Sequence, residues 1–93
     1  MTSGAHLDHA NLRNAQFASA DPVGTYFDGA DLTGANFNAA DLSGAHFPKA
    51  VMRGVSFEGA NLSFAHLSLA RGLNQQQIDS AIVDAMTELP SDL

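Results

Sequence analysis

The chain has 93 residues, the size of a single domain, and its ten acidic and four basic side chains give a net charge of −6. Because it contains no cysteine, disulfides, thiolate metal sites and cysteine nucleophiles are excluded. The acidic balance disfavours non-specific binding to nucleic acid and is compatible with a basic partner.

Residues 1–4 lead directly into patterned sequence, without the apolar core of a signal peptide. No apolar run approaches the ~18 residues that a membrane span requires. We therefore expect a cytoplasmic protein with no membrane span, and we treat residues 1–4 as a lead-in to the domain.

Residues 5–69 form thirteen consecutive groups of five without an insertion: AHLDH, ANLRN, AQFAS, ADPVG, TYFDG, ADLTG, ANFNA, ADLSG, AHFPK, AVMRG, VSFEG, ANLSF, AHLSL. We call the middle position of each group i. Alanine occupies i−2 throughout residues 5–70 except at Thr25 and Val55, and i is Leu, Phe or Met except at Pro22. Such strict self-similarity predicts a repeat architecture.

A five-residue period fits neither a helix nor a flat strand. Successive i residues would point to all sides of an α-helix, and the next i−2 residue would leave the buried face of a strand. Both rows stay inside only if the chain turns a corner in every group, so that four groups close a square coil of about twenty residues. Glycine, which tolerates the backbone angles of a corner, recurs at i+2 as Gly24, Gly29, Gly34, Gly44, Gly54 and Gly59.

Tandem A-[D/N]-[L/F]-x-x groups resemble the pentapeptide-repeat family, in its bacterial type with a C-terminal helical cap, over about two thirds of the chain. The resemblance implies an all-β solenoid, a right-handed quadrilateral β-helix of about three coils, with i−2 and i inside. We expect the β-solenoid over residues 5–69 and the cap over residues 70–93.

Residues twenty positions apart stack in such a coil, so the predicted core can be divided into columns. Phenylalanine falls mainly on two opposite faces and leucine on the other two, with alanine at i−2 leaving room for both. The predicted core residues are Leu7, Leu12, Phe17, Phe27, Leu32, Phe37, Leu42, Phe47, Met52, Phe57, Leu62 and Leu67.

After Ala70 the period changes to that of one apolar helical stripe. The sequence predicts a helix over residues 75–88, with Asn74 and Gln77 at its start and Pro90 after its end. The stripe consists of Ile78, Ala81, Ile82, Ala85, Met86 and Leu89.

This helix is expected to be a structural cap on the open end of the last coil, where Phe64 and Leu69 point outward. The tail also resembles the C-terminal segment of many bacterial pentapeptide proteins, apart from Ile82 and Val83, where those have Cys-Gly. Val83 lies off the stripe and is a candidate exposed contact.

Two outer columns are candidates for chemistry. His6, Tyr26, His46 and His66 share one column, which could be a metal site, a pH switch or a ladder of packed rings. We favour packing, since the column has no carboxylate of its own. Asp21 and Asp41 share another column, but on a flat, wet surface rather than in a catalytic cleft.

The sequence therefore predicts a non-enzymatic interaction module of unknown partner, with no cofactor and no direct nucleic-acid binding. The alternative is a DNA-mimicking modulator of DNA gyrase acting as a dimer, as in family members linked to quinolone resistance. Against it, residues 5–69 carry only six acids and three bases, and three coils measure about 16 Å. We also expect a homodimer, formed through the first coil rather than the helix because the open edge of that coil is uncovered, with Val83 as the weaker candidate contact.

Overall fold

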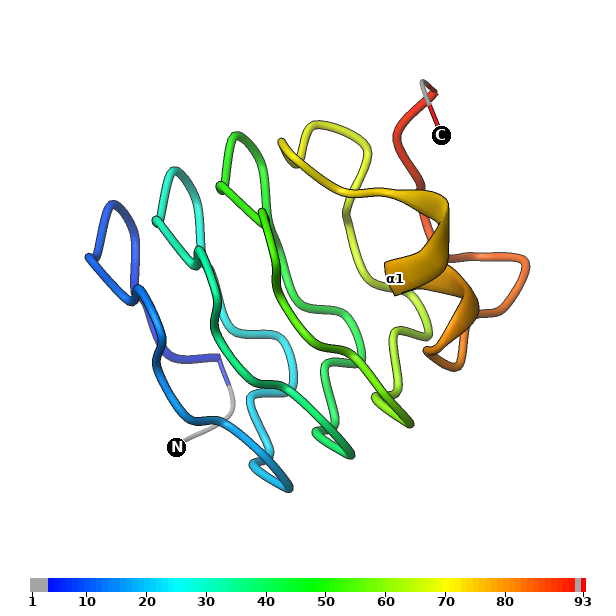
Figure 1. Cartoon of the computed structure of the whole chain (residues 1–93), viewed down its shortest axis with the longest axis horizontal. Coiled ribbons are helices and arrows are strands. Elements are labelled where there is room, and N and C mark those ends of the chain that lie inside the picture. Colours follow the sequence, from blue (N-terminus) through cyan, green and yellow to red (C-terminus); the bar gives the residue numbers. More distant parts are fainter. Residues whose placement is uncertain (1–3, 92) are drawn as a thin grey trace.

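The computed structural model describes residues 4–91 and 93. Its β-structure consists of single parallel bridges, between residues twenty apart as far as Arg71, which stack the coils side by side (Figure 1). The first, second and third faces have bridge columns His6–Tyr26–His46–His66, Asn11–Asp31–Val51–Arg71 and Gln16–Asn36–Ser56, and the fourth face begins with Asp41–Asn61. The molecule measures 25 × 20 × 19 Å.

Each corner of a coil uses a left-handed backbone conformation at i+2. Every i+2 residue from His9 to Phe64 has a φ between 59° and 73°, and half of these residues are not glycine. The N–H of the next i−2 residue closes the corner by donating to the carbonyl of residue i, as from Ala40 to Phe37 at 3.0 Å. A side chain in this conformation costs about 1–2 kcal/mol, so the corners without glycine hold conformational strain.

The core consists of stacked rings separated by alanines. Phe27 and Phe47 stack with ring centroids 5.0 Å apart, while Phe27 meets Phe37 of the neighbouring column edge to face at 5.8 Å. Nine of the twelve predicted core residues are at most 1 % exposed. The other three, which belong to the first coil and lack a coil on one side, are partly buried: Leu7, Leu12 and Phe17.

The C-terminal segment differs from its prediction. The helix, α1, spans Gln75–Asp79 only, and residues 80–91 are not helical. Instead, Ile82 pairs with Asn61 and Glu88 pairs with His66, so the tail forms a fourth coil. In this coil α1 occupies the place of the third face, at the end of the stack (Figure 1).

The helix ends early because the third coil has backbone groups that need partners. The N–H of Leu62 donates to the carbonyl of Ile82 at 2.7 Å, and the N–H of Ile82 donates to Ala60 at 2.8 Å. Continuing the helix would leave such groups unpaired, at about 1–3 kcal/mol for each one that is buried. Of the predicted cap residues, Ile78 is buried, whereas four others are exposed: Ile82, Ala85, Met86 and Leu89.

The tail does not cover the two outward apolar residues Phe64 and Leu69. Phe64 is 54 % exposed and Leu69 is 63 % exposed. Within the described part of the chain, no helix has the length and hydrophobicity needed to cross a bilayer.

Candidate functional site

The histidine column on the first face is a continuous stack of rings. The ring centroids of His6 and Tyr26 are 4.5 Å apart, those of Tyr26 and His46 4.3 Å, and those of His46 and His66 4.4 Å, with planes within 8°. The stack follows from the fold, because parallel bridges place equivalent side chains about 4.8 Å apart. His66 Nδ1 lies 3.1 Å from Glu88 Oε1, so the tail adds a carboxylate at the end of the column.

The electrostatics of the column favour a neutral ring at His46. Burial lowers the pKa of His46, and the neighbouring His66 lowers it further, while Asp28 and Glu88 act in the opposite direction. The described residues contain no group of three or more side chains arranged to hold a metal ion. The rings lie face to face, so their nitrogens do not converge on one point, as the ligands of a metal must.

The aspartates at i−1 support the corners. Asp41 Oδ1 accepts from the Ser43 N–H at 3.1 Å and from Ser43 Oγ at 2.5 Å. Asp31 makes the same two bonds with Thr33, and these bonds hold the pKa of Asp31 below its usual value. Asp21 is exposed. The carboxylates of Asp31 and Asp41 therefore act as local turn-forming groups.

Two groupings on the surface were not found from the sequence. The first is the set of exposed apolar side chains at the C-terminal end, of which the sequence predicts only Phe64, Leu69 and Val83 to be exposed. The second places all four basic residues on the second face and its two corners. The signal for the second was present in the twenty-residue columns, since Arg13 and Arg53 lie two coils apart in one column and Arg71 lies above Val51.

A shallow groove of about 360 Å³ lies between α1 and the third coil. Its lining combines polar residues with one carboxylate and two apolar residues: Ser56, Glu58, Asn74, Gln76, Gln77 and Ser80, with Val55 and Phe57. The groove therefore offers hydrogen-bonding groups and a single charge.

Four-sided coils with a twenty-residue repeat define a quadrilateral β-solenoid. A family model for pentapeptide repeats, in eight copies, matches residues 3–34 and 35–71. The chain belongs to the pentapeptide-repeat family. The family fold is the right-handed quadrilateral β-helix, and its members are generally non-catalytic structural or interaction modules.

Several solved structures of this family are similar to the chain. A pentapeptide repeat protein from the Arabidopsis thaliana thylakoid lumen is 28% identical with a TM-score of 0.48, and the match covers 78% of this chain and 54% of that one. HetL, a pentapeptide repeat protein involved in heterocyst differentiation regulation, comes from the cyanobacterium Nostoc sp. strain PCC 7120. It is 26% identical with a TM-score of 0.43, and the match covers 91% of this chain and 38% of HetL. Another Nostoc pentapeptide repeat protein is 25% identical with a TM-score of 0.40, and the match covers 95% of this chain and 76% of that one.

The chain spans about half the length of the first of these proteins. No curated protein matches the chain at a significant level.

Proposed function

We propose that the chain is a non-enzymatic interaction module that binds another protein through its C-terminal end. One observation carries this proposal: every large apolar side chain that is strongly exposed among the described residues lies after residue 63. They are Phe64, Leu69, Ile82, Val83, Met86, Leu89 and Leu93, each at least 37 % exposed. Large grouped apolar surface of this kind is typical of contact sites.

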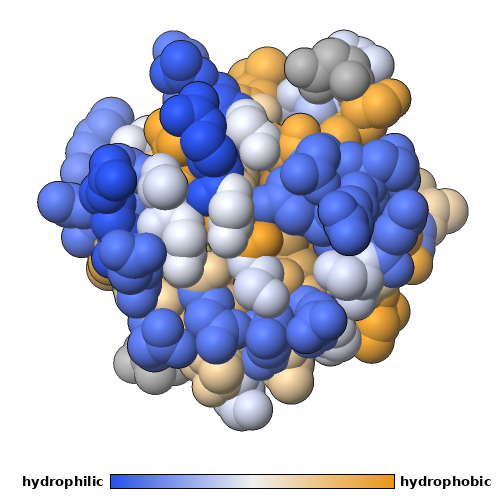
Figure 2. Space-filling model, viewed as in Figure 1, coloured by the Kyte–Doolittle hydropathy of each residue, from blue (hydrophilic) through white to orange (hydrophobic). Residues whose placement is uncertain are grey.

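The surface is a consequence of how the fourth coil is built. Its backbone pairs with the third coil, but no coil stacks on its other side, so side chains such as Val83 and Leu89 are 40 % and 37 % exposed. Hydrophobic atoms accordingly appear at the C-terminal edge of the molecule, on the right in Figure 2. A partner that covers this end would remove apolar surface from water, which contributes about 25 cal/mol of favourable free energy per Å².

A photo-crosslinking amino acid at position 86 tests the proposal in an extract of the producing cells. Met86 is 62 % exposed, so the replacement leaves the core intact. The matched control places the same amino acid at Ala18, an exposed residue of the first coil. We expect a discrete crosslinked protein from position 86 and none from position 18. Equal labelling from both positions would contradict the proposal.

The gyrase alternative has less support in the charge distribution. A mimic of duplex DNA needs negative charge along its length, whereas the basic residues here lie together on the second face. The longest dimension, 25 Å, is also shorter than one turn of DNA at about 34 Å. Gyrase supercoiling assays, with and without quinolone, distinguish the two functions. Inhibition or protection by the purified chain would favour mimicry.

The homodimer and the cytoplasmic location remain predictions. The first coil has partly buried apolar residues, and the C-terminal end has strongly exposed ones, so both ends are candidate contacts. Light scattering decides whether a dimer forms, and a Met86→Asp variant decides which end forms it. A dimer that survives this substitution uses the first coil.

A further inference from the structure

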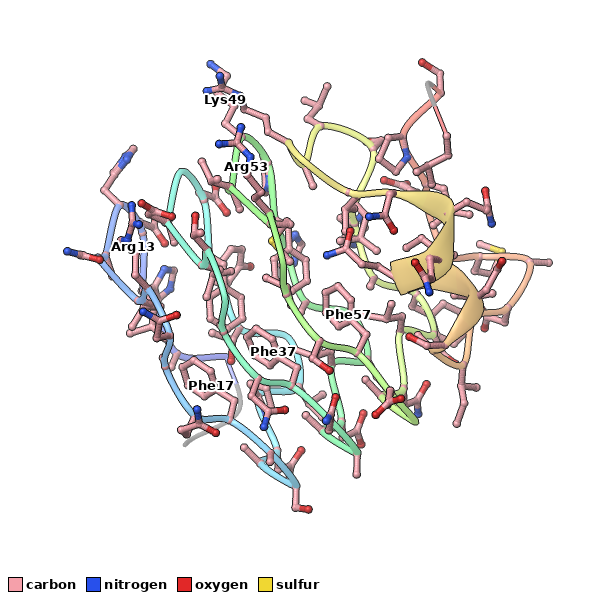
Figure 3. All side chains as sticks on the ribbon, in the orientation of Figure 1. Arg13, Phe17, Phe37, Lys49, Arg53 and Phe57 are labelled. Atoms are coloured by element: carbon pink, nitrogen blue, oxygen red, sulfur yellow. The ribbon has the colours of Figure 1, made fainter. Side chains whose placement is uncertain are left out.

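The basic residues gather on one side of an acidic molecule. The second face and its two corners contain all four of them, although the chain has ten acidic residues. Three of the four surround Val51 in the last two coils, and we call this set the cationic cluster: Lys49, Arg53 and Arg71. All three are exposed. Figure 3 shows Lys49 and Arg53 projecting from one edge of the solenoid, with Arg13 on the same edge nearer the first coil.

Backbone hydrogen bonds hold the cluster together. Arg71 pairs with Val51, because its N–H donates to Ala50 at 2.8 Å and its carbonyl accepts from Met52 at 2.7 Å. The N–H of Lys49 donates to the carbonyl of Leu69 at 2.9 Å. Neighbouring coils lie about 4.8 Å apart, so the three charged side chains start from one rigid surface.

Gly72 brings the tail close to Arg53. Its φ is 84°, and a Cβ placed on it would lie 3.2 Å from the backbone nitrogen of Arg53 and 3.3 Å from the Arg53 Cβ. A larger residue at this position would therefore be strained by the positive φ and would need its neighbours to shift by a few tenths of an ångström. The glycine keeps Arg71 and Arg53 on adjacent parts of the same surface.

The charges of the cluster are available for an external partner. Arg13 Nη1 lies 3.5 Å from Asp31 Oδ2, which accounts for the fourth basic residue. Within the described residues, no carboxylate lies within 4.0 Å of a nitrogen of Lys49, Arg53 or Arg71.

Lys49 is also held in a strained conformation. Its φ is 60°, whereas the equivalent corner of the preceding coil has Gly29. A lysine here costs about 1–2 kcal/mol relative to an unstrained backbone. Five other corners without glycine share this conformation, so the strain does not mark a binding site. It does mean that glycine at position 49 would remove the charge without destabilising the corner.

We propose that the cationic cluster binds an extended acidic peptide segment of a partner protein, one in which carboxylate and apolar side chains alternate. Arginine forks bind carboxylates in bidentate geometry, and a lysine adds a third positive charge. Leu69 is 63 % exposed beside Lys49, and the half-buried Val51 lies in the centre, so the surface also offers apolar contacts. This inference rests on the proposed interaction role and adds the chemistry of one partner.

The same features favour a peptide over a nucleic acid. A polyanion of many phosphates is repelled at long range by a chain of net charge −6, whereas a short segment meets only the local field. The cluster spans two coils, which is too short for a track of successive phosphate contacts. The apolar contacts around Val51 have no use in binding a sugar–phosphate backbone.

The test uses a fluorescein-labelled peptide of about nine residues that alternates glutamate and leucine, measured by fluorescence anisotropy. We expect binding that weakens as salt rises from about 50 mM to about 500 mM. Arg53→Gln should weaken it about tenfold, the effect of one lost charge-assisted contact. Arg13→Gln is the matched control, since it lies in the same column and is already paired, and it should leave binding unchanged.

A second variant separates binding from folding. Lys49→Gly removes the charge and the backbone strain together, so it should weaken peptide binding while keeping or raising the Tm. The proposal is overturned if a glutamine–leucine peptide binds equally well, or if Arg53→Gln and Arg13→Gln have the same effect. It is also overturned if an oligothymidylate or anionic phospholipid vesicles bind the cluster while the peptide does not.

Failure of this inference can be told apart from failure of the proposed function. Crosslinking from position 86 without peptide binding would remove the cationic cluster as a site and leave the interaction module. Peptide binding without crosslinking would remove the C-terminal end and leave the cluster.

Discussion

The regular coils and the fourth coil both need partners for their backbone hydrogen-bonding groups, and they obtain these partners in different ways. In residues 5–71, parallel bridges pair the i−1 residues of neighbouring coils at a constant register of twenty. In the tail the register becomes 21 at Asn61–Ile82 and 22 at His66–Glu88. The extra residues are taken up first around α1 and then in the turn near Met86, so the tail follows the coil without repeating its sequence.

Side chains replace backbone donors where the tail leaves the regular path. Gln77 Nε2 donates to the carbonyls of Met52 at 3.0 Å and Val55 at 2.9 Å. Thr87 Oγ1 donates to the carbonyl of Leu62 at 2.8 Å. A solenoid end can therefore be closed by a few polar side chains at defined positions, without a long helix over it.

The stability of the regular coils should depend most strongly on the volume of the inward-pointing side chains. Ala40 is 1 % exposed at i−2, so Ala40→Leu should lower the free energy of unfolding by about 1–3 kcal/mol through overpacking. Ala39→Leu is the control at the neighbouring exposed corner and should be nearly neutral. Urea denaturation of both variants measures the difference, and equal losses would mean that the inward and outward positions are wrongly assigned.

The tail should instead be sensitive to the loss of a polar group. Gln77→Ala removes the donor to two carbonyls, so we expect a loss of about 1–2 kcal/mol in the free energy of unfolding. Gln76→Ala, an exposed neighbour on the same helix, should cost little. If the two variants melt alike, the side chain of Gln77 does not substitute for backbone pairing.

The corners should respond to backbone strain alone. Gly44 has a φ of 68°, and no other atom lies within 4 Å of the place that a methyl group on it would take. Gly44→Ala should therefore cost about 1 kcal/mol without any clash. Ala39 has a φ of 59°, and Ala39→Gly should shift the Tm upward by a smaller amount. Thermal melts of the two variants that moved in the same direction would contradict this account of the corners.

The smallest effect concerns the histidine column. Burial lowers the pKa of His46 below 6.5 in the folded chain, so the unfolded chain takes up this proton at higher pH. Stability should therefore fall as the pH drops through about 6.5. His46→Phe keeps the stack but cannot titrate, and its Tm between about pH 7.5 and pH 5.5 should decline less than that of the wild type. A steeper decline in the variant would mean that protonation of His46 stabilises the fold, which would contradict this prediction.

The repeat region could be predicted from sequence because each residue type there has one structural reason. Alanine at i−2, an apolar residue at i and glycine at i+2 all require the same square coil, and the buried rings of Phe37 and Phe57 follow from it. The tail could not be predicted in the same way. Its apolar spacing fits a helical stripe, yet Leu73, Ile78 and Val83 also recur every five residues, one position out of register.

The choice between those two patterns depends on hydrogen bonds with the third coil, which periodicity does not report. The surface groupings were missed for a related reason. The cationic cluster combines Lys49 and Arg53 of one coil with Arg71 of the next, from three different positions in the five-residue group. Only a comparison of neighbouring columns, rather than of single columns, would have found it.

The constant register of the regular coils determines which changes in chain length the molecule can accept. Inserting twenty residues between coils would return every later side chain to its own face and lengthen the rod by one layer. Inserting five would preserve the local repeat but rotate all later groups by one face, so that Phe47 would no longer lie over Phe27. The fold therefore accepts insertions of whole coils, because only these keep the stacked rings of each column aligned.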